Sequence, residues 1–237
     1  MRTSLTSKIL QGIAVGTASS IGAFFVWTKH CKIAQLEPNS DPLFANQWYK
    51  KLNANANPTL HDECVRRLPL FKLRPELVED ANKGGSKLVE ALSQGVWGGH
   101  GYTIQRLYLQ NKYRNDTTTA HQLWDRPALL NSSYDSGTEI TDHFVVVDKT
   151  PTSILIRCGD SPLNSPDGQR LSDGLFEITA TTDFDRGFAE FRLKSIFFQG
   201  EGTVEDKSKP VMPAHMVWAH QQYAKLWMES AMSQIKR

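Results

Sequence analysis

Two side chains are placed to act as general acids or bases inside an otherwise apolar pocket. Asp142 shares an alternating face of a hydrophobic segment with Ile140, Phe144 and Val146, where burial would raise its pKa and suit it to proton transfer. His220 lies among the apolar positions of a long helical pattern. We therefore predict Asp142 and His220 as catalytic residues. The alternatives are a strand-end aspartate bonded to backbone or to an arginine, and a satisfied core histidine.

Other side chains are predicted to line the pocket or its rim. The predicted ligand-binding residues are Trp97, His100, Tyr102, Phe144, Phe191, Tyr223 and Trp227. Large aromatic residues belong to the core in many proteins, and core packing is the alternative for them. His143 adjoins Asp142, but successive side chains of a strand point to opposite faces. We therefore do not expect His143 and Asp142 to act as a pair in one pocket.

The sequence lacks the motifs of the common cofactor-dependent or hydrolytic enzymes. There is no GxxxxGK[ST], no HExxH and no GxSxG, so a P-loop, a zincin site and a nucleophile elbow are not predicted. Gly99–Gly101 begins like a dinucleotide fingerprint, but Ile104 stands at the third glycine and the segment follows a helical pattern. These glycines suit a tight turn between helices, or a cavity rim. We expect no cofactor.

Composition indicates an ordinary globular protein with an ample core. The 237 residues are 40% hydrophobic and 22% charged, with a formal net charge of +2. No cluster of Lys and Arg is interleaved with aromatic residues, so nucleic-acid binding is not indicated. Cys31, Cys64 and Cys158 form no CxxC pair. We therefore expect neither a metal site nor a disulfide framework.

An uncharged, mostly apolar stretch runs from Ile9 to Trp27. As a helix it would be about 28 Å long, close to the thickness of the hydrocarbon core of a bilayer. It predicts a single-pass transmembrane helix within an anchor at residues 1–32, and hence a membrane-bound protein. A cleaved signal or transit peptide and a buried helix are the alternatives. Basic residues on both flanks leave the orientation of the anchor in the membrane open. The glycosylation sequons at Asn115 and Asn131 are used only if the domain faces a lumen.

Residues 33–59 have the composition of a linker. They contain two prolines and an Asn-rich tract that ends at Pro58, which disfavour a continuous helix. One short amphipathic helix is expected within them, packing on the domain or on the membrane; its apolar residues are Phe44, Trp48, Tyr49 and Leu52. Residues 60–237 are then the ligand-binding domain.

The segment from Gly137 to Gly200 predicts an antiparallel meander. Four runs rich in Val, Ile, Phe and Thr are separated by turn residues: Glu139–Lys149, Ser153–Cys158, Gly174–Thr182 and Phe188–Gln199. Each run has one apolar and one more polar face, so we expect the sheet to cover a core on one side only. The charged residues of the polar faces are then expected to form cross-strand pairs.

The elements around this meander complete an α+β chain. A strand at Cys64–Leu73 precedes helices that begin at Pro75 and Ser86 and a third at Tyr102–Tyr113. After the meander, Ala214–Ile235 predicts one long helix without Gly or Pro.

This order of elements over Leu60–Ile235 resembles the helix-grip arrangement of the START/Bet v 1-like superfamily. The resemblance implies a curved antiparallel sheet that grips the C-terminal helix around an apolar cavity. It transfers no catalytic residue, because the superfamily has no universal ones. Segments Gly95–Arg114, Gly137–Pro162 and Ser172–Ala180 also resemble uncharacterised proteins of filamentous fungi, some of which accompany secondary-metabolite pathways.

Three functions fit these features. The first is an accessory biosynthetic enzyme, a cyclase, isomerase or dehydratase acting without a cofactor on a hydrophobic polyketide or terpenoid. The second is a membrane-tethered lipid or sterol carrier, and the third is a structural membrane protein without a ligand. Ionisable side chains that converge on the pocket would favour the enzyme, and an all-apolar lining would favour the carrier.

Overall fold

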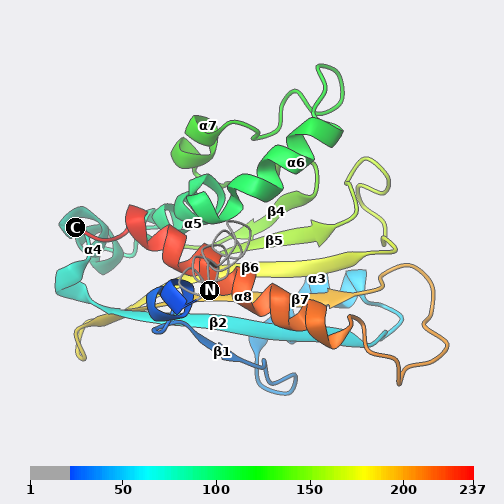
Figure 1. Ribbon diagram of the computed structural model, residues 1–237, viewed down its shortest axis with the longest axis horizontal. Coiled ribbons are helices and arrows are strands. Elements are labelled where there is room, and N and C mark those ends of the chain that lie inside the picture. The colour runs from blue at the N-terminus through cyan, green and yellow to red at the C-terminus, as the bar shows by residue number, and fades with distance from the viewer. Residues whose placement is uncertain (1–21) are drawn as a thin grey trace, which may run out of the picture.

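The computed structural model describes residues 22–237, which form one seven-stranded antiparallel sheet covered by helices (Figure 1). Residues 9–21 of the expected transmembrane helix lie outside the described residues. None of the helices within residues 22–237 has the length and hydropathy of a membrane span. The strands lie in the order β1-β2-β7-β6-β5-β4-β3, with β1 at Lys32–Ala34, β2 at Thr59–Pro69, β3 at Glu139–Ile140, β4 at Phe144–Lys149, β5 at Ser153–Gly159, β6 at Asp173–Asp183 and β7 at Phe188–Phe198.

Most helices lie on one face of the sheet. The α-helices are α2 (Pro42–Ala45), α3 (Gln47–Leu52), α4 (Pro75–Asn82), α5 (Lys87–Gly98), α6 (Thr103–Tyr113), α7 (Arg126–Asn131) and α8 (Ala214–Ala231). In Figure 1, α5, α6 and α8 lie in front of the sheet and α3 lies behind it. The α+β class, the curved antiparallel sheet and the long C-terminal helix are therefore confirmed.

The strand predictions are correct for the end of the meander and wrong at its beginning. The expected strand Glu139–Lys149 is divided into β3 and β4 by a turn at residues 141–143. The expected strand Cys64–Leu73 instead starts at Thr59 and ends at Pro69, where a 3₁₀ turn begins. The helix α8 begins at the expected residue and ends at Ala231, followed by a 3₁₀ turn.

Residues 33–59, expected as a linker, pack as part of the fold. The strand β1 extends the sheet by pairing with β2. Residues on α2, α3 and the preceding segment form a second apolar cluster with the sheet, made of Leu36, Leu43, Leu52, Leu155, Leu175, Ile196 and Phe198. The sheet therefore buries apolar side chains on both faces, contrary to the one-sided expectation. The reason is that the second face of β5, β6 and β7 carries large aliphatic and aromatic residues at this end of the sheet.

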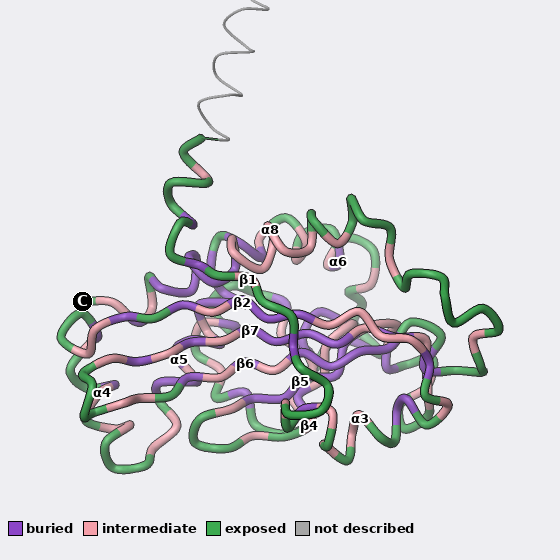
Figure 2. Tube along the Cα trace, turned by 90° about the horizontal axis from the view of Figure 1, so that it is seen from below, coloured by how far each residue is buried: buried purple, intermediate pink, exposed green. Residues whose placement is uncertain are grey.

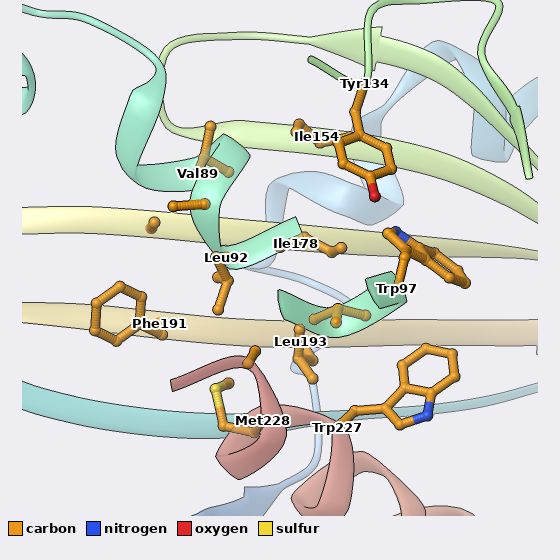
Figure 3. Close-up of a cluster of buried hydrophobic side chains, with 14 of the residues drawn as sticks. Val89, Leu92, Trp97, Tyr134, Ile154, Ile178, Phe191, Leu193, Trp227 and Met228 are labelled. Atoms are coloured by element: carbon orange, nitrogen blue, oxygen red, sulfur yellow. The ribbon is translucent and has the colours of Figure 1, made fainter. Parts of the chain in front are cut away.

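The main core lies between the sheet and the pair of helices α5 and α8. Figure 3 shows Leu92 of α5 and Met228 of α8 in one cluster with Ile178 and Leu193 of the sheet. All four side chains are almost fully buried. The apolar stripes predicted for both helices therefore face the same core, as amphipathic helices should.

Glycines let α5 and α8 approach each other very closely. A Cβ atom at Gly95 would lie 2.6 Å from the Cα and O atoms of Ala231. The backbone N–H of Gly101 donates a hydrogen bond of 3.0 Å to Ser230 Oγ. The glycine-rich stretch that resembles a dinucleotide fingerprint thus serves helix packing in this fold.

Replacing Gly95 with alanine tests this close contact. Gly95→Ala should lower the free energy of unfolding by about 1–3 kcal/mol, because an added methyl group has no space against the α8 backbone. Urea denaturation of the wild type and the variant measures the difference. Gly22→Ala is the control, since no atom of the described residues lies within 4 Å of a Cβ at that helical glycine. Equal stability of Gly95→Ala and the wild type would show that the helices are not in contact as described.

Candidate functional site

A cavity of about 250 Å³ lies between the sheet and the helices α6 and α8. Its wall is mostly apolar and aromatic; it is lined by Gln105, His143, Phe144, Cys158, Gly159, Phe176, Phe197, His220, Tyr223, Ala224 and Trp227. Four of these residues come from one face of α8. Apolar cavities with a few converging polar groups are the usual form of small-molecule sites.

Aromatic rings make up one wall of the cavity. The Trp227 ring centroid lies 5.6 Å from that of Phe176 and 4.9 Å from that of Tyr223, in edge-to-face arrangements. Trp97 of α5 packs behind Trp227 at 5.2 Å. Rings packed edge to face hold one another in place. This wall is therefore a rigid surface suited to a flat or greasy ligand.

One polar cluster reaches the cavity through His220. Asp62 and Ser195 are directly opposite partners on β2 and β7, and the Ser195 hydroxyl donates a 2.7 Å hydrogen bond to Asp62 Oδ1. The Nε2 atom of His220 lies 3.1 Å from both Asp62 Oδ1 and Ser195 Oγ. Asp62 and Ser195 are almost fully buried, whereas His220 is only partly covered.

The hydrogen bonds of this cluster assign the proton on His220. Because the Ser195 hydroxyl donates to Asp62, Nε2–H of His220 is the donor shared by the carboxylate and the hydroxyl oxygen. Nδ1 is then the ring nitrogen left to exchange a proton with a ligand. Serine and aspartate share one ring nitrogen, so this is not the arrangement of a Ser-His-Asp hydrolase, in which they contact different nitrogens.

The carboxylate of Asp62 is stabilised in its charged form. Burial acts to raise the pKa of Asp62, but the hydrogen bond and charge of His220 and the hydrogen bond of Ser195 outweigh it, and the pKa is lowered overall. Asp62 therefore remains ionised and holds the His220 ring in one orientation.

A second polar pair reaches the cavity through His143. The turn before β4 places Thr141 and Asp142 at φ values of 46° and 68°, a region that residues other than glycine rarely occupy. Two hydrogen bonds hold the turn: the Asp142 N–H donates to Gln122 Oε1 at 2.7 Å, and the Ser161 hydroxyl donates to Asp142 Oδ1 at 2.8 Å. Asp142 thus lies in a strained turn rather than on a strand.

The strained turn brings Asp142 and His143 together, contrary to the expectation that they point to opposite faces. Asp142 Oδ2 lies 3.2 Å from His143 Nδ1. The alternation of a strand does not apply, because residues 141–143 have left the extended conformation. Burial lowers the pKa of His143 below its ordinary value of 6.5, and the carboxylates of Asp142 and Asp160 oppose this without cancelling it. His143 is therefore mainly neutral at pH 7.

Two further polar groups line the cavity in their protonated forms. Burial raises the pKa of the Tyr223 hydroxyl to about 12, so it can donate a hydrogen bond to a ligand. Burial likewise raises the pKa of the Cys158 thiol to about 12. A thiol of such low acidity is a poor nucleophile. Within residues 22–237, no group of three or more His, Cys, Asp and Glu side chains is arranged to hold a metal ion.

The structure assembles part of the predicted site. The predicted residues that line the cavity are Phe144, His220, Tyr223 and Trp227. Asp142 lies behind His143 and does not itself line the cavity. Trp97 and Tyr102 pack behind the aromatic wall, 5.0 Å apart between ring centroids.

The remaining two predicted residues lie away from the cavity lining. Phe191 is fully buried beside Leu92 in the main core (Figure 3). His100 is exposed in the 3₁₀ turn before α6. Both are corrections to the predicted ligand-binding set.

Sequence reasoning missed Asp62 and Ser195, and placed His143 on the wrong face. A signal for the first two was present. Asp62 lies on the same face of β2 as Leu60 and Cys64, and Ser195 lies on a face of β7 that is otherwise apolar. A polar residue on an apolar strand face is a sign of a buried site. Because the predicted strand began at Cys64, Asp62 was not recognised as a polar residue on an apolar strand face.

Comparison of the chain with protein-family models, with curated proteins and with solved structures finds no match.

The lowered pKa of Asp62 predicts how stability depends on pH. A carboxylate whose pKa is depressed in the folded state stabilises the fold above its unfolded pKa, near 3.8, and this contribution is lost as the pH falls further. The wild type should therefore lose stability below about pH 4 more steeply than Asp62→Asn. Urea denaturation between pH 2.5 and 7 measures both slopes. Asp185→Asn, in the exposed hairpin turn, is the control; identical slopes for the wild type and Asp62→Asn would contradict the assignment.

Proposed function

We propose that this protein is a membrane-tethered enzyme that acts by acid–base chemistry on a small hydrophobic molecule, without a cofactor. The supporting observation is that two histidines, each within 3.2 Å of a buried aspartate, line one aromatic cavity. Ionisable groups buried beside a cavity with a specific charge partner are characteristic of functional sites. Convergent ionisable groups distinguish this site from the all-apolar lining expected of a carrier.

The groups around the cavity suit proton transfer in an isomerisation, cyclisation or dehydration. Neutral His143 takes a proton from a carbon next to a ligand carbonyl, and Asp142 stabilises the imidazolium that forms. The Tyr223 hydroxyl donates a hydrogen bond to the oxygen on which charge develops. His220, held through Nε2–H by Asp62, gives a proton carried on Nδ1 to another position of the ligand. After the product leaves, the proton taken up by His143 passes through water back to His220 Nδ1, so one proton is taken, one is given and no co-reactant is needed.

The size of the cavity limits the ligand. At about 250 Å³ it exceeds the roughly 150 Å³ apolar cavity that binds benzene, and falls below the roughly 300–1,000 Å³ of pockets for drug-sized ligands. A compact polyketide or terpenoid of one or two rings suits this volume. A whole sterol or phospholipid would require the helices to move apart, which makes the carrier function the weaker alternative.

The fold and the apolar N-terminal sequence also support this proposal. A sheet that wraps around α8 beside an apolar cavity supports the helix-grip resemblance and the ligand-binding role that it implies. The apolar sequence before Gly22 supports a single-pass anchor. An anchored enzyme would act where hydrophobic substrates concentrate.

The catalytic role of the histidines is tested with isosteric variants. His143→Gln and His220→Gln should each reduce turnover by about 10²–10⁴-fold, the usual contribution of a positioned acid or base. Their affinity for the ligand should remain within about threefold, because glutamine keeps a similar volume and polarity. The measurement is mass-spectrometric conversion of hydrophobic extracts of the native source by the full-length protein.

His61→Gln is the matched control for these variants. His61 neighbours Asp62 but lies on the other face of β2, against Phe44. Its replacement should leave turnover unchanged. Turnover that survives in both His143→Gln and His220→Gln would remove the acid–base assignment, and binding without any turnover in the wild type would establish the carrier.

The pH dependence of kcat/KM tests the base separately. Since the pKa of His143 is lowered from 6.5, kcat/KM should be level around pH 7 and fall only at pH values below about 6.5 as the imidazole gains a proton. In His143→Gln, the residual activity should lack this acid limb. An acid limb of the same position and slope in the variant would show that another group is the base.

A further inference from the structure

The helix α6 presents its apolar stripe outward. Ile104, Leu107 and Tyr108 follow one another at the spacing of one helix face, and they are 85%, 52% and 60% exposed. Only Leu109 of this helix is buried. Within residues 22–237, no other element covers this stripe.

A second set of exposed apolar residues lies on the first half of α8. Met216 and Trp218 are 49% and 58% exposed. Residues two apart project from different sides of a helix, and Met216, one turn before the cavity-lining His220, lies on the cavity side of α8. We call the surface formed by Met216 with Ile104, Leu107 and Tyr108 the α6–α8 face. The cavity lies beneath it, because Gln105 of α6 and residues from His220 to Trp227 of α8 form part of its wall.

The chain enters the fold from the same side. Figure 2 shows the first described residues rising from the side of the sheet that carries α6 and α8. This helical turn, residues 22–27, exposes Phe25, Val26 and Trp27. The apolar sequence continues back to Ile9, outside the described residues. A bilayer that receives this segment would lie over the α6–α8 face.

The charges on this side fit an anionic surface. The helix α6 contains Arg106 and Lys112 and no acidic residue. The single carboxylate of α8, Glu229, is buried and paired with Arg66 at 2.8 Å. Exposed Lys29 and Lys32 follow the apolar segment. Apolar and aromatic residues bordered by lysines are the pattern of interfacial membrane binding.

We propose that the α6–α8 face docks onto an anionic lipid bilayer, as a membrane contact separate from the N-terminal segment. The exposed apolar and aromatic side chains enter the interface, and two lysines, the exposed Lys112 of α6 and the partly exposed Lys225 of α8, contact the headgroups. The cavity then opens toward the lipid rather than toward bulk water. This docking requires no catalysis, so it stands or falls independently of the proposed reaction.

Fluorescent labels on the full-length protein in liposomes test the docking. The native cysteines Cys31, Cys64 and Cys158 are all buried, so single exposed cysteines introduced as Leu107→Cys and Met216→Cys take the label selectively. Gln47→Cys, on α3 behind the sheet, is the control. Liposomes contain a lipid-borne quencher in phosphatidylcholine, with or without phosphatidylserine.

The labels at positions 107 and 216 should be quenched severalfold more than the label at 47, and more strongly with phosphatidylserine. The additional changes Lys112→Gln and Lys225→Gln should reduce this quenching. Equal quenching at all three positions, with and without phosphatidylserine, would overturn the proposal. Cross-linking between copies through position 107, without lipid quenching, would also overturn it, because the face would then be covered by a second copy of the chain.

Discussion

The last turns of α8 pack against α5 so closely that no side chain fits at position 95. The backbone of Ala231 occupies the space where a Cβ of Gly95 would lie. Next to this contact, Glu229 pairs with Arg66 of β2 inside the core. Removing one partner of such a buried pair costs about 3–5 kcal/mol, because the other charge is left unpaired. The C-terminal end of α8 is thus fixed to both a helix and the sheet.

The first half of α8 is joined to the sheet by His220 but packs less closely than the last turns, and the cavity lies under it. From Trp227 to Ala231 every residue of the helix is buried, whereas the residues before Trp227 are partly or fully exposed. The fixed end sets the direction of the helix, and this direction holds His220 and Tyr223 over the sheet. Space remains between helix and sheet because the close packing at position 95 is not continued along α8.

The two histidines are positioned by different physical means. His220 is oriented by a cross-strand pair, Asp62 and Ser195, on two long regular strands. His143 is oriented by a turn with two residues at positive φ, each costing about 1–3 kcal/mol. Such strain persists only where surrounding contacts enforce it. Here the Asp142 N–H donates a hydrogen bond to Gln122, and the Ser161 hydroxyl donates one to Asp142.

The sequence allowed the elements to be predicted better than the site. Periodicity located α5, α8 and the strands from Ser153 onward, because each buries a continuous face. It failed at residues 141–143, where β-like residue types occur in a turn whose positive φ is set by tertiary hydrogen bonds.

The pairing of Asp62 with Ser195 was also beyond prediction. It depends on the register of two strands whose paired residues are 133 positions apart in the sequence, and no local pattern of residue types encodes that register. His220 was found because it interrupts an apolar helical stripe, a signal that needs no knowledge of the partner strand.

The central claim is that the cavity beneath α8 holds a small hydrophobic molecule, and native mass spectrometry tests it most directly. Full-length wild type and Ala224→Trp, whose added ring would fill the cavity from α8, are purified from the native source and compared. The account predicts a bound small molecule on the wild type and none on Ala224→Trp. A wild type that carries no molecule and takes up no apolar fluorescent probe, or a variant that carries the same molecule, would contradict it.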